Sequence, residues 1–423
     1  MRVPRVVVSG VGFVTSIGND RATVAASLRE LRSGIERWDF LPGSELAVKV
    51  AGTIKNFDTS GPQWASWRWP DGYRFTKEVL RGMPPHGLYA MCAMEQAISD
   101  SRLTDAELTS EDTGLFCGSA GSPRQMRQFL NQIHESRGDR VHPMGVVSSI
   151  AGTLNFNLAA HYKICGAVSG FVSACASTTH ALGYAFDEIK LSRQRRMLIV
   201  GGEDLTWESI YPFHGMRALS RQSDPALASR PFDRDRDGFV GTGGSVALVL
   251  EDYETASARG ATIYAEMLGW GQASDGHSVA ISDPDGRGLA RAMRRALDSA
   301  GVKPGEIDYV NAHATSTPTG DASEARALKS VFADGGHHPY VSGLKALTGH
   351  GLSMAGVMET AFCSLCLSEG FTPGAANLQN PDPVCEGLNL PRATLPIAPR
   401  LILKNSSGFG GSNVSLVLRR WEK

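Results

Sequence analysis

A cysteine stands where a strand-like run gives way to a helical pattern. Residues 166–174 are mostly small and apolar, as in a buried strand, and Cys175 follows them directly. After it, apolar residues recur at helical spacing from Ala181 to Ile189. The first turn of a helix has unpaired N–H groups and a partial positive charge, which favour a thiolate over a thiol and can hold an oxyanion. The pattern therefore predicts a nucleophile, with packing as the alternative role for a cysteine in an apolar run.

Two histidines lie at polar junctions later in the chain. His313 is at the polar end of a strand in NAHATSTPTGD, and His350 opens a helix in LKALTGHG, five residues after Lys345. Any one of the eleven histidines is more often structural than catalytic. If the strand ends of both parts of the chain face a common centre, however, Cys175, His313 and His350 meet there. We interpret these three residues as a candidate reaction centre.

The elements that would position these residues form two similar series of strands and helices. The second series begins near residue 254, and its stretch around His350 mirrors the stretch around Cys175. This alternation predicts a layered α/β fold with an N-terminal half over 1–253 that carries the cysteine and a C-terminal half over 254–423 that carries both histidines. Small residues after His350 predict close packing of its helix against the Cys175 helix: Gly351, Ser353, Ala355 and Gly356.

Two other segments need an interpretation. Residues 56–86 are rich in Pro and Gly and contain three tryptophans, which predicts a surface excursion whose aromatics either pack on their own domain or form an interface. Residues 124–140 read as a helix. The lone C-x-x-C pair of Cys363 and Cys366 lies in an apolar helical pattern and favours packing over metal or redox chemistry.

Composition excludes several classes of protein. The 423 residues carry a net charge of -1, so no overall basic field indicates nucleic acid. No apolar run approaches membrane-spanning length, and the seven cysteines are too few and scattered for a disulfide framework. We expect a cytoplasmic protein that binds neither nucleic acid nor membrane.

Six motifs together carry a family resemblance. They are SACAS, GGEDLTWE, RDRDGFV, NAHATSTPTGD, KALTGHGLSMAG and NSSGFGGSN. In this order, and over essentially the whole chain, the sequence resembles the β-ketoacyl-acyl-carrier-protein synthases, and among the elongating enzymes it is most similar to type I. The resemblance implies a thiolase-like fold, with two pseudo-symmetric halves in an α-β-α-β-α layered sandwich. It also implies a homodimer, with a heterodimer as the alternative.

The resemblance assigns roles residue by residue. Cys175 corresponds to the nucleophile that takes an acyl chain as a thioester, and His313 and His350 to the pair that promotes decarboxylation of a malonyl thioester. No metal or cofactor is implied, since the phosphopantetheine arm arrives on the acyl-carrier protein. The further correspondences are Lys345 with Glu359 as a supporting polar pair, Phe409 as a gating aromatic whose N–H joins that of Cys175 in an oxyanion hole, and Thr315 and Thr317 as hydroxyls that bind the arm.

The carrier protein of this family is strongly acidic, so docking needs basic residues near the pocket mouth. Each candidate could instead be an ordinary solvated surface residue. The candidates are Lys77, Arg81, Arg124, Arg127, Arg137 and Arg140.

Three departures from the family pattern bear on substrate range. Ala314 stands where glycine is usual, Ser407 where phenylalanine is usual, and the segment 56–86 is longer than expected. These changes leave open a ketosynthase of a specialised polyene or polyketide pathway. Two further alternatives are a non-catalytic partner subunit, which would characteristically lack the cysteine, and a cysteine hydrolase, which the paired histidines fit poorly.

Overall fold

The computed structural model describes residues 3–333 and 338–422, and a ten-stranded mixed sheet forms its frame. From one edge to the other, the order is β10 (Tyr340–Ser342), β9 (Tyr309–Asn311), β11 (Leu401–Gly408), β12 (Ser412–Arg420), β8 (Ala265–Ser274), β1 (Val6–Val14), β7 (Gly244–Asp252), β6 (Arg196–Glu203), β4 (Thr113–Gly118) and β5 (Val168–Phe171).

The two ends of this sheet repeat one topology. Read inward from its edge, one end runs β5-β4-β6-β7-β1 and the other runs β10-β9-β11-β12-β8. In each, the three outer strands are parallel and the two inner contacts are antiparallel. Each strand of the first series thus has a counterpart in the second, in the same chain order, which confirms the two pseudo-symmetric halves. The boundary proposed between residues 253 and 254 falls in α11 (Tyr253–Ala258), which links β7 to β8.

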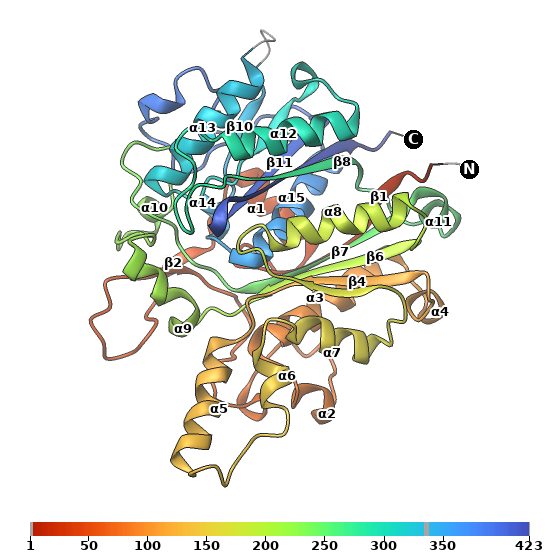
Figure 1. Ribbon diagram of the computed structural model, residues 1–423, viewed down its shortest axis with the longest axis vertical. Helices are drawn as coiled ribbons and strands as arrows, with labels where there is room; N and C mark the ends of the chain where they lie inside the picture. The colour runs from red at the N-terminus through yellow and green to blue at the C-terminus, as the bar shows by residue number, and fades with distance from the viewer. Residues whose placement is uncertain (1–2, 334–337, 423) are drawn as a thin grey trace.

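Helices cover and separate the two ends of the sheet (Figure 1). Between them lie α8 (Ser177–Lys190) and α15 (Ala355–Glu369), while α12 (Arg287–Ala300) and α13 (Pro318–Phe332) cover one outer face and α3 (Pro85–Ser101) and α7 (Thr153–Tyr162) the other. This succession of helix, sheet, helix, sheet and helix layers confirms the expected thiolase-like architecture. The remaining elements are α1 (Arg21–Glu30), β2 (Ile35–Arg37), β3 (Val50–Gly52), α2 (Lys77–Leu80), α4 (Asp105–Leu108), α5 (Pro123–Glu135), α6 (Gly145–Ser149), α9 (Trp207–Ile210), α10 (Pro225–Ala228) and α14 (Lys345–Thr348).

The central layer is closely packed. A Cβ added at Gly356 on α15 would overlap Thr179 Oγ1 on α8, so a glycine is required where the two helices cross. Cys363 and Cys366 are fully buried on α15 and contribute to the core, as the sequence indicated. No helix of the described residues is long and apolar enough to cross a membrane.

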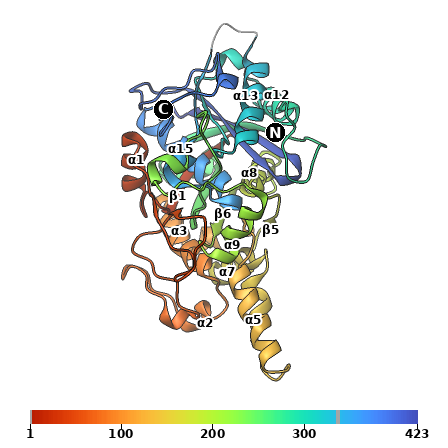
Figure 2. The same ribbon diagram turned by 90° about the vertical axis from the view of Figure 1, so that its left-hand side faces the viewer.

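Two elements differ from the sequence-based expectation. The strand before Cys175 is not buried, because β5 is an edge strand whose residues alternate between exposed and half-buried. The helix expected over 124–140 ends at Glu135, because the chain turns there and the Gly138 N–H closes the turn on the Ile133 carbonyl at 2.8 Å. Arg137 and Arg140 therefore lie in a loop beyond the end of α5, which projects from the body of the protein (Figure 2).

The tryptophan-rich excursion packs on its own half. Trp67 is 3% exposed, and its indole N–H donates to the Gly61 carbonyl at 3.0 Å. Trp64 and Trp69 are half-buried against the cluster around α3. Of the two roles considered for these aromatics, the structure supports packing.

Candidate active site

Cys175 sits on a strained turn between β5 and α8. Ala174, just before it, has a left-handed backbone with a φ of 50°. Two hydrogen bonds of the Ser177 hydroxyl offset the strain of this conformation. The Ser177 hydroxyl donates to the Ala174 carbonyl at 2.6 Å and accepts from the Ser173 N–H at 2.9 Å. Gly408 lies against the same turn, because a Cβ there would be 2.5 Å from the Ser173 carbonyl oxygen. The turn thus fixes the cysteine beside the loop that carries Phe409.

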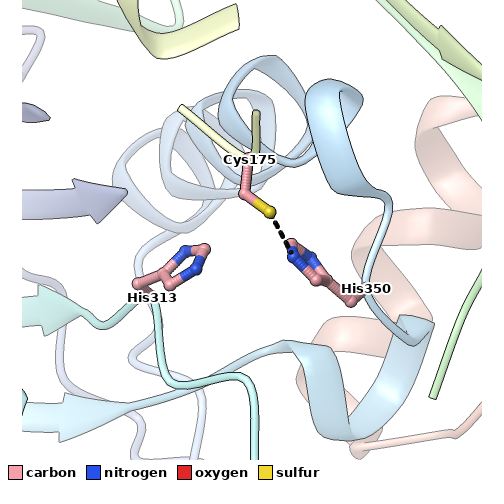
Figure 3. A group of neighbouring side chains, drawn as sticks. All are labelled: Cys175, His313 and His350. Atoms are coloured by element: carbon pink, nitrogen blue, oxygen red, sulfur yellow. Dashed lines mark hydrogen bonds between the residues drawn. The ribbon is translucent and has the colours of Figure 1, made fainter. Parts of the chain in front are cut away.

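His313 and His350 converge on this cysteine from the other half (Figure 3). His350 Nε2 is 3.0 Å from Cys175 Sγ, and the two imidazole rings are 5.4 Å apart at an angle of 82°. One nitrogen of each histidine and the sulfur all lie within 4.8 Å of one another. His313 follows β9 and His350 follows α14, so strand ends from both halves meet as the sequence predicted.

A buried carboxylate holds the backbone of the His313 loop. Glu324 accepts hydrogen bonds from the N–H groups of His313 and Ala314 at 2.9 and 2.7 Å, and Asn405 donates to it at 3.1 Å. Ala314, at the position where glycine is usual, has a φ of 21°, a value that costs a residue with a Cβ some strain. Glu324 therefore keeps His313 in place despite the alanine.

Two lysines approach one glutamate behind the histidines. Lys345 donates to the His313 carbonyl at 2.6 Å and pairs with Glu359, which confirms the contact between the residues of the expected polar pair. Lys404, on β11, lies 3.3 Å from the other oxygen of Glu359. The exposed fraction of all three side chains is 1% or less.

Burial and these cations keep both histidines neutral. Desolvation and the positive charges of Lys345 and Lys404 hold the pKa of His313 and of His350 well below the usual value. Neutral imidazoles are present throughout the physiological pH range, and each offers one N–H to a ligand oxygen.

The state of Cys175 differs from the expectation. Burial raises the pKa of its thiol to about 12, an effect that the nearby Lys345 opposes but does not reverse. Thiol, not thiolate, is therefore the resting form, and desolvation outweighs the helix terminus. His350 Nε2 lies 3.0 Å from this thiol, so in the tautomer with its hydrogen on Nδ1 the neutral ring accepts a hydrogen bond from the S–H group.

A cavity of about 370 Å³ opens above these residues. Thr315 and Thr317 line it, with their hydroxyl oxygens 3.0 Å apart. A row of aromatic contacts leads from the mouth to the base: Phe409 lies 5.9 Å from Phe213, Phe213 lies 5.4 Å from Phe239, and Phe239 lies 5.3 Å from the His350 ring. The cavity thus connects the positions expected for the gate, the arm and the nucleophile.

Cysteine and two histidines are also a donor set that zinc binds. The charges do not fit a metal, because Lys345 and Lys404 place positive charge behind both imidazoles. The groups around the histidines do not fit a metal site either. A histidine ligand is usually oriented by an acceptor at its other ring nitrogen, and among the described residues neither Nδ1 has one. The arrangement suits thioester chemistry better.

None of the six docking candidates lines this cavity. Arg124 binds carbonyl groups of the tryptophan-rich excursion, and Arg127 pairs with Glu208 at 2.7 Å. Lys77 and Arg81 line a separate groove of about 650 Å³ between α2 and α5. Arg137 and Arg140 are exposed in the loop after α5.

Sequence reasoning missed Lys404 and Glu324. The signal for Lys404 was its place directly after Leu-Ile-Leu, where β11 is buried on both faces. The signal for Glu324 was an acidic residue on the apolar face of α13, where both neighbours are buried. A charged residue within a buried pattern indicates a partner that only the structure identifies.

The layered fold and the Cys-His-His centre define a thiolase-fold condensing enzyme, and comparison with known proteins gives the family. Residues 4–256 match the family "Beta-ketoacyl synthase, N-terminal domain" and residues 264–379 match "Beta-ketoacyl synthase, C-terminal domain". The chain belongs to the β-ketoacyl synthase family and is an acyltransferase of the condensing class.

Named relatives cover nearly the whole chain. The 3-oxoacyl-[acyl-carrier-protein] synthase 1 of Escherichia coli is 39% identical over 98% of this chain and 99% of its own. The synthase 1 of Haemophilus influenzae is 36% identical over 99% of each. Both support the similarity to type I enzymes.

Solved structures agree on the fold. A β-ketoacyl synthase from Burkholderia phymatum matches with a TM-score of 0.89 at 32% identity, over 99% of this chain and all of that one. The ishigamide ketosynthase/chain length factor matches with 0.88 at 28%, and a type II PKS acyl-carrier protein in complex with its ketosynthase with 0.87 at 27%, each over the full length of both chains.

Proposed function

We propose that this protein elongates an acyl chain by two carbons through decarboxylative Claisen condensation with malonyl-acyl-carrier protein, as in fatty acid synthesis. The observation that carries the proposal is the meeting of Cys175 Sγ with one nitrogen of each histidine, within 4.8 Å, at the base of the cavity. A thiol and two neutral imidazoles supply a nucleophile and two N–H donors, which are the groups that the reaction requires.

Acyl transfer comes first. The Cys175 sulfur attacks the acyl thioester carbonyl while its proton passes to His350 Nε2, 3.0 Å away. That proton then goes to the departing thiolate of the carrier's phosphopantetheine arm, so His350 returns to its neutral form.

Decarboxylation follows once the malonyl thioester occupies the cavity. Once the sulfur is acylated it no longer offers a proton to His350 Nε2, so the neutral ring can carry its hydrogen on that nitrogen. N–H groups of His313 and His350 then donate to the thioester carbonyl oxygen, and loss of carbon dioxide leaves the electron pair on the enolate that they stabilise. Lys345, bonded to the His313 carbonyl, holds the first of these donors in position.

Condensation completes the cycle. The enolate carbon attacks the acyl-cysteine carbonyl, and the backbone N–H groups of Cys175 and Phe409 stabilise the oxyanion. When this intermediate collapses, the carbon–sulfur bond breaks, the β-ketoacyl product stays on the carrier, and the freed sulfur takes up a proton to restore the thiol.

An acyl-carrier protein is the partner that we propose for this cycle, and it brings the only prosthetic group. Two relatives are named 3-oxoacyl-[acyl-carrier-protein] synthases, and one structural neighbour is an acyl-carrier protein in complex with its ketosynthase. Thr315 and Thr317 can receive the phosphopantetheine arm inside the cavity. Lys77 and Arg81 are exposed, with no carboxylate within ion-pair distance among the described residues, and can receive acidic side chains in their groove.

Charge reversal tests this docking surface. Arg81→Glu is expected to raise KM for malonyl-acyl-carrier protein about tenfold and to leave kcat unchanged, because rim charges act mainly on association. A malonyl thioester without the carrier protein is the matched control, and an equal rise in its KM would argue against docking.

We also propose a homodimer that works in the cytoplasm. No strand in the described part of the chain pairs with the outer edge of β5, and apolar Val168 and Val172 beside it are 40% and 70% exposed, a surface that pairing with a second copy would cover. The cysteines are all unpaired, which suits a reducing compartment. Sedimentation of the purified chain tests the dimer, and a stable monomer that gains activity only with a second chain would indicate a heterodimer.

A specialised ketosynthase is the second candidate. Ser407, where phenylalanine is usual, donates to Asn413 at 2.7 Å in the cavity wall, and the ishigamide enzyme is among the structural neighbours. A smaller side chain at this position can admit a different starter.

Intact-protein mass spectrometry tests both candidates. The protein is mixed with acyl-carrier protein charged with acyl chains of graded length, then with malonyl-carrier protein, and Cys175→Ala is the control. An adduct on wild type only, released as a β-ketoacyl product two carbons longer, supports elongation. Acylation by polyene starters alone supports the second candidate, and release of the adduct by water without malonyl substrate supports a hydrolase.

A further inference from the structure

Lys404 gives the ion-pair group behind the histidines more positive charge than Glu359 balances. Glu359 is the one acidic side chain within ion-pair distance of Lys404 or Lys345 among the described residues, and both ammonium groups approach it. If both are protonated, the buried group of three carries one net positive charge. Such an excess is costly in an interior, so its position next to the reacting residues calls for an explanation.

The groups around Lys404 leave its positive charge able to act on the histidines. From α8, the Thr179 hydroxyl accepts from Lys404 Nζ at 3.2 Å, and the Ser406 hydroxyl accepts from it within β11. From α15, Glu359 attracts it, and burial raises the pKa of Cys363 so that this thiol is neutral. Among the residues that the structure describes, Lys345 on α14 is the cation that acts most strongly on it.

We propose that Lys404 is a positioning residue for the condensation reaction, whose ammonium group acts through Glu359 and Lys345 to keep His313 and His350 neutral. The inference rests on the proposed function for its chemical meaning, since only neutral imidazoles have both the acceptor and the donor roles assigned above. Protonation of either histidine would place a third cation beside the group of Lys345, Glu359 and Lys404, which already has a positive surplus. The same field favours the enolate, which is an anion.

The titration of Lys404 also limits the rate of condensation at alkaline pH. Burial lowers the pKa of Lys404 to about 8, with Glu359 opposing the shift. Lys404 is charged below that pH and neutral above it, so the positive field behind the histidines declines as the pH rises through about 8. Both histidines are neutral at that pH, so the loss of charge acts on the enolate, and condensation is expected to slow through this range in wild type.

Lys404→Met tests the proposal, with Lys49→Met as the matched change at an exposed lysine. The titration of ¹³C-labelled histidines is followed by NMR, which needs no substrate and so separates this inference from the proposed function. In Lys404→Met, the His313 and His350 signals are expected to titrate on the order of one pH unit higher, because a like charge has been removed. Unchanged titration with a lowered melting temperature would overturn the proposal and leave Lys404 a packing residue.

Thr179→Val is a second, isosteric test that does not depend on the stability of the first variant. It removes a hydroxyl that stabilises the charged lysine, so the pKa of Lys404 falls further. The alkaline limb of single-turnover condensation is then expected to move to lower pH while the rate at pH 6.5 stays within about twofold of wild type. An alkaline limb that is absent in wild type, or unmoved in Thr179→Val, would contradict the proposal.

Discussion

The two equivalent strand-to-helix junctions of the repeated topology differ in structure and in the residues they carry. The junction from β5 to α8 carries Cys175 on a short strained turn beside an exposed sheet edge. The junction from β10 to α15 is longer, contains α14, and places Lys345 and His350 where at most 2% of the side chain is exposed. On the proposed mechanism, the first junction presents Cys175 to the incoming thioester, and the second provides the buried charges that act on the histidines. The same strand-to-helix unit thus occurs twice, and one copy gives access to the cysteine while the other provides the buried charges.

The largest effect is expected at the first junction. Cys175→Ala should abolish the acyl adduct and slow condensation by at least about 10⁴-fold, because among the described residues Cys175 is the one cysteine that lines the cavity. Cys165→Ser, at an exposed cysteine, is the control and should keep the adduct in mass spectrometry. An adduct that persists in Cys175→Ala would show that another residue is the nucleophile.

Changes at the histidines should distinguish the two junctions. His313→Ala and His350→Ala are each expected to slow decarboxylation of malonyl-acyl-carrier protein by about 10²–10⁴-fold, which release of labelled carbon dioxide measures. Of the two variants, His350→Ala alone should also slow acylation of Cys175, because among the described residues it is His350 that lies within hydrogen-bond distance of the sulfur. Equal acylation rates in the two variants would show that the 3.0 Å contact does not carry the proton.

A smaller effect concerns the crossing of the helices that follow the two junctions. Gly356→Ala should lower the free energy of unfolding by about 1–3 kcal/mol, because the added methyl group overlaps Thr179. Gly305→Ala is the matched control, since a Cβ there meets nothing within 4 Å. Urea unfolding measures both, and equal stabilities would mean that α8 and α15 separate easily.

The smallest effect is expected in the His313 loop. Ala314→Gly removes the strain of a positive φ but also raises the conformational entropy of the unfolded chain. Because these effects oppose each other, the free energy of unfolding should rise by no more than about 1 kcal/mol. Chemical denaturation measures the change. A loss of stability instead would show that Glu324 already relieves the strain completely.

The sequence was most informative where patterns repeat. Alternating strands and helices predicted the layered halves, and mirrored junctions predicted that Cys175 and His350 meet. The assigned roles came from motif resemblance rather than from periodicity, and the proposed experiments are their test. The helix crossing followed from the small residues after His350, since a residue without a side chain in an apolar helix indicates a close neighbour.

The sequence was least informative about surroundings. An apolar run did not distinguish the edge strand β5 from a buried one, because that depends on which strands lie beside it. The helix terminus indicated a thiolate at Cys175, whereas the extent of desolvation depends on side chains distant in the sequence. For the same reason Arg124 read as a free surface charge, although the folded excursion occupies its guanidinium group with carbonyl oxygens.

The division of the centre between the two halves also matters during synthesis. A ribosome completes Cys175 and all strands of the first half before it reaches His313 or His350. On the proposed mechanism, a nascent chain thus has the nucleophile without the base that receives its proton, and burial that depends on the second half has not yet occurred. We therefore expect recovery of acyl transfer after denaturation to lag behind recovery of helical circular dichroism and to report the docking of the second half.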